Sequence, residues 1–189
     1  MPWISGNRYL SLDETYNNAA LIAPIMMGYG WSRTATAALL GNMRGESGCN
    51  PGIWQYLQPF QGAYGLTQWD PYTKYSNWYG SGWEDNGPGE CACVNDESLN
   101  NRQWFRNEEF GMDPPITFQQ FRVNTNLPLD DLSDYFMLFY EHPLDPWNEI
   151  YVRRNYSQDM YNRFCSPTTL PIWLLMKISN DNTRRWLKL

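Results

Sequence analysis

The chain has 189 residues and a formal net charge of −6, and its length suits one compact domain. Hydrophobic residues make up 42% of the chain and charged residues 18%, proportions that exclude an intrinsically disordered protein. The acidic balance argues against a nucleic-acid partner, which would require clustered lysine and arginine.

Two helices are predicted in the first quarter of the chain. The stretch Ser11–Glu14 has the pattern of a capping box, so a helix should begin there. The helix should be disturbed at Pro24, because proline removes a backbone donor, and it should end near Gly28. Ser32 can cap a second, alanine-rich helix that stops at Gly48.

The middle of the chain lacks helical periodicity. From Asn50 to about Gly89, glycine, proline and aromatic residues predict loops with a small β-hairpin. Residues 83–101, which contain GPGE and CAC, have the composition of an irregular insertion. Helical character returns around Trp104 and again over residues 117–121.

Two stronger helices are predicted near the end, over residues 131–141 and 150–164. We therefore expect an α+β, mainly α domain over residues 1–165. Residues 166–189 form a tail whose apolar patch and basic end suggest docking onto another surface. The most apolar stretch, residues 172–178, is too short to span a membrane, and the N-terminus does not have the pattern of a signal peptide.

The four cysteines, Cys49, Cys91, Cys93 and Cys165, permit disulfides, but their spacing does not pair them. Cys91 and Cys93 could be combined with the single histidine, His142, into a zinc site. The usual C-x-x-C spacing is absent, so we expect no metal and no cofactor.

One helix-end glutamate is a candidate catalytic acid. Leu39, Met43 and Glu46 are spaced by four and then three residues, so they share a helix face. Because the first two belong to an apolar stripe, Glu46 should emerge at the edge of the core. Burial and the helix dipole both favour a protonated carboxyl group there. Glycosidic cleavage requires such a group to protonate the leaving oxygen, although most helix-end carboxylates have no catalytic role.

Two stretches carry a resemblance to a known family: GNMRGESGCNPG over residues 41–52 and AYGLTQW over residues 63–69. Together they resemble the phage tail lysozymes, relatives of goose-type lysozymes and soluble lytic transglycosylases. The resemblance is strongest to the lysozyme domain of tail-tip (knob) proteins of phi29-like podophages. It covers residues 7–164 and includes FYEHP at residues 139–143. It implies a lysozyme-like fold with a small β-hairpin region beside the catalytic helix.

The resemblance also implies roles for individual residues. Glu46 matches the catalytic glutamate, and Gln68 matches a residue that lines the sugar-binding cleft. Tyr64 and Trp69 flank the hairpin, where their rings either stack on sugars or pack beneath the turn. Tyr140 is the candidate for a late-helix tyrosine that contacts the catalytic glutamate in related transglycosylases.

The second carboxylate of a hydrolase is not identified by any motif. Asp70, Glu84 and Asp85 fall in predicted loops, and each is a candidate for a base that holds a water molecule. A lytic transglycosylase needs no such base, because the 6-hydroxyl of the sugar attacks. Glu141 is expected to pair with an arginine in a structural role.

The resemblance therefore implies cleavage of the β-1,4 bond between N-acetylmuramic acid and N-acetylglucosamine in bacterial peptidoglycan. The protein would belong to the virion, in the phage tail, would contact other tail proteins, and would open the host cell wall during genome ejection. The net charge of −6 suits an enzyme that a particle delivers better than one that diffuses to an anionic wall. The aromatic content, 16%, suits contacts with sugar rings.

Two other classes of function remain open to test. One is a non-catalytic glycan-binding or structural tail component that keeps the lysozyme-like fold, since fold alone does not establish activity. The other is a peptidoglycan endopeptidase. It is disfavoured because HExxH, GxSxG and a suitable Cys–His pair are absent from the sequence.

Overall fold

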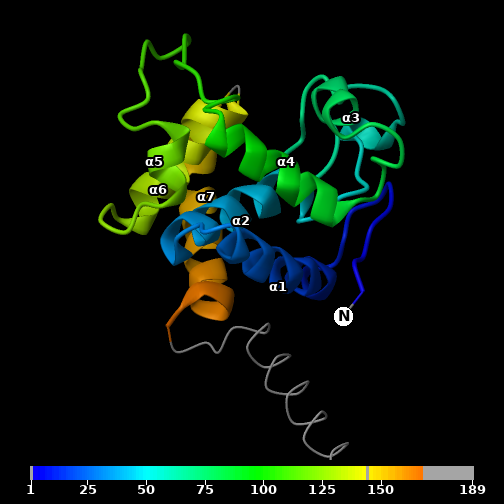
Figure 1. The fold of residues 1–189 in the computed structure, drawn as a ribbon, viewed down its shortest axis with the longest axis horizontal. Coiled ribbons are helices and arrows are strands. Elements are labelled where there is room, and N and C mark those ends of the chain that lie inside the picture. Colours follow the sequence, from blue (N-terminus) through cyan, green and yellow to red (C-terminus); the bar gives the residue numbers. More distant parts are fainter. Residues whose placement is uncertain (1, 144, 168–189) are drawn as a thin grey trace, which may run out of the picture.

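The computed structural model describes residues 2–143 and 145–167, and most of its regular structure is helical (Figure 1). The α-helices are α1 (Leu12–Gly28), α2 (Arg33–Ser47), α3 (Thr73–Tyr79), α4 (Gly87–Leu99), α5 (Phe118–Arg122), α6 (Leu129–Phe136) and α7 (Pro146–Met160). A 3-10 turn, η1 (Gln55–Leu57), and two π-helical turns, η2 (Met137–Glu141) and η3 (Tyr161–Cys165), complete the described elements. The predicted mainly helical class is confirmed.

The first two helices begin and end where the sequence predicts. The capping box is formed: the backbone N–H of Ser11 donates to Glu14 at 2.8 Å, and Ser11 accepts in return from the Glu14 backbone. Helix α1 continues through Pro24, so the predicted disturbance does not divide it. Gly48, in the left-handed conformation with φ 64°, ends α2.

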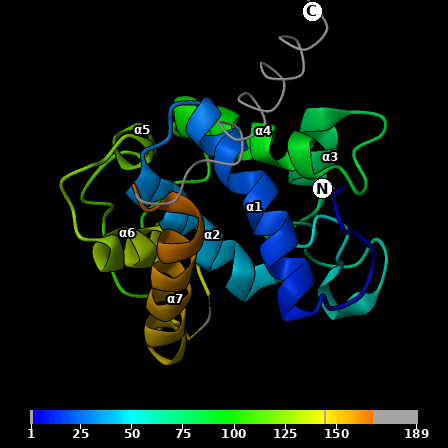
Figure 2. The ribbon, with the colours of Figure 1, turned by 90° about the horizontal axis from the view of Figure 1, so that it is seen from below.

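Helix α2 lies at the centre of the molecule. In Figures 1 and 2, α3 and its loops lie on one side and α5 and α6 on the other, with α1, α2 and α4 between them. Helix α7 packs along α2 and closely approaches its backbone. A Cβ atom on Gly41 would lie 2.6 Å from the Cα atom of Ser157, and one on Gly45 would lie 2.5 Å from Nε of Arg153. These two glycines therefore allow α7 to contact the last turns of α2.

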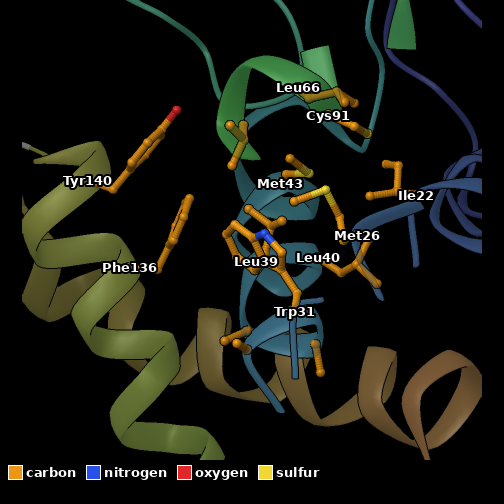
Figure 3. Close-up of a cluster of buried hydrophobic side chains, with 14 of the residues drawn as sticks. Ile22, Met26, Trp31, Leu39, Leu40, Met43, Leu66, Cys91, Phe136 and Tyr140 are labelled. Atoms are coloured by element: carbon orange, nitrogen blue, oxygen red, sulfur yellow. The ribbon is translucent and has the colours of Figure 1, made fainter. Parts of the chain in front are cut away.

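The core surrounds α2 (Figure 3). Side chains from α1, the segment before α2, the Gly65–Gln68 turn, α4 and the α6–η2 helix meet the apolar side chains of α2. Two rings of the last element are stacked, with 4.5 Å between the centroids of Phe136 and Tyr140. All four cysteines are buried free thiols. The labelled core residues are Ile22, Met26, Trp31, Leu39, Leu40, Met43, Leu66, Cys91, Phe136 and Tyr140.

The predicted β-hairpin is not present in the described residues. In its place, Tyr64 forms isolated antiparallel bridges with Trp54 and with Trp69. The chain turns sharply between these bridges, because Gly65 and Gln68 both have positive φ, 80° and 51°. The turn stays beside α2, because Ser47 Oγ donates to the Leu66 carbonyl at 2.9 Å.

Helices α3 and α4 lie where loops and an irregular insertion are predicted. Helix α4 forms because Asn86 accepts a hydrogen bond from the Gly89 backbone at 3.0 Å and Pro88 lies in the first turn. Cys91 and Val94 then face the core. Conversely, Trp104 is not helical: it lies in an irregular segment, and its indole donates to the Ile116 carbonyl at 2.8 Å.

Both predicted late helices are present, but each ends in a π-helical turn. The helix predicted over residues 131–141 is α6 followed by the π-helical turn η2, and that predicted over 150–164 is α7 followed by η3. The tail predicted to dock lies mostly outside the described residues. Within the described residues, no helix is both long enough and apolar enough to cross a membrane.

Candidate active site

Glu46 lies in the last turn of α2, where the apolar stripe of Leu39 and Met43 ends. Both of these side chains are fully buried, whereas the side chain of Glu46 is 20% exposed. The expected position at the edge of the core is therefore observed. The carboxylate forms an ion pair with Nη2 of Arg153 from α7. This ion pair holds the end of α2 against α7.

Arg153 is the centre of a charged cluster that joins α2, η2 and α7. Its side chain is 5% exposed and packs against Gly45. Nη1 donates to the Asn42 carbonyl at 2.6 Å, and Nε donates to Glu149 at 3.0 Å. Sequence reasoning missed Arg153. The available signal was the spacing of Glu149 and Arg153 by four residues on a predicted helix.

Glu141 is the buried member of this cluster. Its side chain is 2% exposed, and Oε2 lies 3.5 Å from Nη1 of Arg153, which confirms the predicted pairing with an arginine. Within the described residues, neither of its carboxyl oxygens accepts a hydrogen bond. Burial raises the pKa of Glu141 well above its ordinary range, and the neighbouring Glu46 raises it further, while Arg153 opposes both. The buried position of Glu141 therefore favours its protonated form more than an exposed position would.

A cavity of about 420 Å³ opens beside this cluster. Gln68, Asp70 and Glu141 all line it, so the cavity brings the predicted cleft residue to the charged cluster. The Gln68 side chain also stabilises its own turn, because its Nε2 donates to the Gly65 carbonyl at 2.9 Å. Of the predicted candidates for a second carboxylate, Asp70 lies in this cavity. The backbone N–H of Asp85 instead donates to the Tyr64 hydroxyl at 2.7 Å.

The three aromatic residues predicted to contact sugars are buried. Tyr64, Trp69 and Tyr140 are between 1% and 2% exposed, so packing is the role that their rings have in this structure. Trp69 and Tyr140 reach the wall of the cavity, and sugar binding by them stays a prediction. Tyr140 makes its close carboxylate contact with Glu97, donating at 2.6 Å, in place of the implied contact with Glu46.

Glu97 was also missed, because it lies on α4 in the segment predicted to be irregular. Its carboxylate accepts hydrogen bonds from Tyr140 and, at 3.2 Å, from Trp69 Nε1. Burial raises the pKa of Glu97 to about 7, although these hydrogen bonds favour the carboxylate. Two buried glutamates therefore adjoin Tyr140: Glu97 accepts its hydrogen bond, and Glu141 is the next residue in the chain. In the described residues, no group of His, Cys, Asp and Glu side chains is arranged to hold a metal ion.

Two comparisons with known proteins agree with each other. The sequence profile of a family described as phage tail lysozyme matches residues 17–164, a range that contains Glu46, Glu141 and Arg153. The chain is also similar to Morphogenesis protein 1 of Bacillus phage B103, with 35% identity over 146 residues. That alignment covers 75% of this chain and 38% of the relative, so the chain spans less than half of the relative's length.

Proposed function

Because the chain belongs to the phage tail lysozyme family, we propose that it cleaves glycan strands of bacterial peptidoglycan, with Glu46 as the general acid. The bond would be the β-1,4 linkage between N-acetylmuramic acid and N-acetylglucosamine. The enzyme would act from the phage tail, in contact with other tail proteins, and would open the host wall during genome ejection. The family match and the phage relative support this setting.

The placement of Glu46 and Glu141 around the same arginine, Arg153, is the observation that carries the proposal. A general acid needs a proton near neutral pH and access to the leaving oxygen. Burial favours the protonated form of Glu141, whereas Glu46 is partly exposed. Glu46 is therefore the member of the pair that can reach a substrate and give a proton to the leaving oxygen. Arg153 keeps Glu46 in place and balances the negative charge that remains after proton transfer.

The products of digestion test the proposal. Purified peptidoglycan treated with the protein should yield soluble glycan fragments with new muramic acid ends, which mass spectrometry identifies. Reducing ends would mean that water attacks, with Asp70 as the base to examine next. Anhydro ends would mean that the sugar's own 6-hydroxyl attacks. Intact glycan strands, with or without binding, would contradict the proposal and favour a non-catalytic glycan-binding component.

Replacing Glu141 by glutamine should move the alkaline limb of the activity profile to lower pH. In the native pair, the second carboxyl group keeps a proton available because two adjacent carboxylates repel each other. Glutamine at position 141 cannot hold an ionisable proton beside Glu46, so activity near neutral pH should fall while activity at acidic pH persists. The measurement is kcat/KM against pH. A loss of equal size at every pH would indicate a purely structural role.

The stability of the fold should also depend on pH through Glu141. The raised pKa means that folded Glu141 keeps a proton that the unfolded chain releases, so this residue makes the fold less stable as pH rises above its ordinary value. The Glu141→Gln variant lacks this effect. The unfolding free energy of the variant minus that of the native protein should therefore increase as the pH rises from about 4.5 to 8. Urea titrations at several pH values measure the difference, and Glu149→Gln, at a more exposed partner of Arg153, is the matched control.

A further inference from the structure

A second cavity, of about 370 Å³, adjoins the one that contains Gln68 and Glu141. Lys74, Gln103 and Phe105 line both, so the two cavities share a wall; we call them together the groove. Phe105 is 54% exposed and offers an apolar ring to a ligand in the groove. The groove thus continues from the charged cluster toward α3 and α4.

Lys74 is an exposed cation at the junction of the two cavities, in the first turn of α3. Its backbone N–H donates to the Pro71 carbonyl at 2.9 Å, but its ammonium group makes no hydrogen bond or ion pair in the described part of the chain. The arginines of the groove differ in this respect. Arg102 is paired with Asp96, and Arg106 lies 2.6 Å from Asp113. The ammonium group of Lys74 is therefore free to bind an anion from solution.

The acidic residues of the groove form no ion pair with Lys74 in the described residues, although Lys74 acts at longer range to favour the carboxylate of Glu97. Burial raises the pKa of Glu97 to about 7 and raises that of Glu141 well above its ordinary range. Near neutral pH, both therefore carry less negative charge than two free carboxylates. Asp70 is exposed in the same cavity and is not within ion-pair distance of Lys74. The unpaired positive charge of Lys74 also contrasts with the formal net charge of the chain, which is −6.

We propose that Lys74 is a specificity-determining residue that binds a carboxylate carried by the glycan substrate, an inference that rests on the proposed function. Each N-acetylmuramic acid carries a lactyl ether whose carboxyl group is either free or amide-linked to a stem peptide. The stem peptide brings carboxylates of its own. Lys74 lies in the same groove as Glu141, and Glu141 shares its partner Arg153 with Glu46, so the Lys74 ammonium group can hold a carboxylate of a glycan bound next to this cluster.

Three forms of one glycan preparation test this inference. The first keeps its stem peptides, the second has lost them to an amidase and exposes lactyl carboxylates, and the third has those carboxylates methyl-esterified. The kcat and KM of the native protein are compared with those of Lys74→Met, Lys74→Arg and Arg8→Met. Arg8→Met is the control for net charge alone, because Arg8 pairs with Glu14 and is not among the residues that line the groove.

Lys74→Met should raise KM about 3- to 10-fold on a carboxylate-bearing strand, leave kcat unchanged, and have no effect on the esterified strand. Lys74→Arg and Arg8→Met should behave like the native protein. An effect confined to the first form identifies a peptide carboxylate, and one confined to the second identifies the lactyl carboxylate. Equal KM changes on all three forms, or no change on any, would overturn the inference.

Failure of the proposed function would be visible separately. If the native protein released no fragments from any strand, glycan cleavage would be wrong, but Lys74 could still be tested. The Kd of the same three strands, followed through tryptophan fluorescence, then takes the place of KM. Loss of selectivity for carboxylate-bearing strands in Lys74→Met would still support the inference, and unchanged selectivity would contradict it.

Discussion

Replacing Glu46 by glutamine should lower kcat for glycan cleavage by about 10²- to 10⁴-fold, the range expected when a general acid is removed. Glutamine keeps the size of the side chain and can still accept a hydrogen bond from Arg153, but it has no proton to give to the leaving oxygen. Because the native carboxylate is partly exposed and remains on the surface of the cluster, stability should change by less than about 1 kcal/mol. Release of soluble fragments under saturating substrate measures the rate.

Glu149→Gln is the matched control for this experiment. Glu149 contacts the same guanidinium group as Glu46, but it lies on α7 and its side chain is 42% exposed. The variant removes one negative charge from the same cluster without removing the proposed acid, so its kcat should stay within a few-fold of the native value. Equal losses in the two variants would show that charge balance around Arg153, and not proton donation by Glu46, explains the effect.

Retained activity in Glu46→Gln would contradict the assignment of the acid. Glu97 would then be the next residue to examine, because it has a pKa of about 7 and lines the groove. Its burial and its hydrogen bonds to Tyr140 and Trp69 make it less accessible than Glu46. Glu97→Gln measured beside Glu46→Gln separates these two possibilities.

Local signals predicted much of the fold. Ser11, Ser32 and Gly48 mark helix ends because a hydroxyl that accepts a backbone N–H, or a residue with positive φ, acts within one turn. The same signals failed for α4. Its glycines and proline are typical of loops, but the helix is held by the Asn86 cap and by burial of Cys91, a tertiary effect that composition does not reveal.

Only those residues of the candidate site whose position depends on their own helix could be predicted from the sequence. The placement of Glu46 follows from the periodicity of its own helix. Arg153 is 107 residues away in the sequence, and its contact depends on how closely α7 approaches Gly45. Tyr140 was placed on the correct late element, but this segment winds as a π-helix. Its hydroxyl meets Glu97, whose helix was not expected, so no analysis of the Tyr140 segment alone could identify that partner.

Arg153→Met should lower the free energy of unfolding by about 3 to 5 kcal/mol, the usual effect of leaving buried charges without their partner. Glu141 would keep its buried position without a cation, and the Asn42 carbonyl would lose its 2.6 Å hydrogen bond. The loss should be smaller at pH 5 than at pH 8, because without the cation buried Glu141 must be protonated, and its protonation costs more free energy as the pH rises. Urea unfolding at the two pH values measures both effects.

Arg154→Met is the control that separates the loss of a buried ion-pair partner from the general effect of removing an arginine from α7. Arg154 is the next residue, and its ion pair with Asp134 is more exposed, so its loss should cost only about 1 kcal/mol. A double variant, Arg153→Met with Glu141→Met, should recover most of the stability because no buried charge is then unpaired. Such a double variant would lack the partner that keeps a proton beside Glu46, so it should be stable but nearly inactive at neutral pH. Recovery of stability without recovery of activity would show that this cluster is retained for chemistry and not for folding.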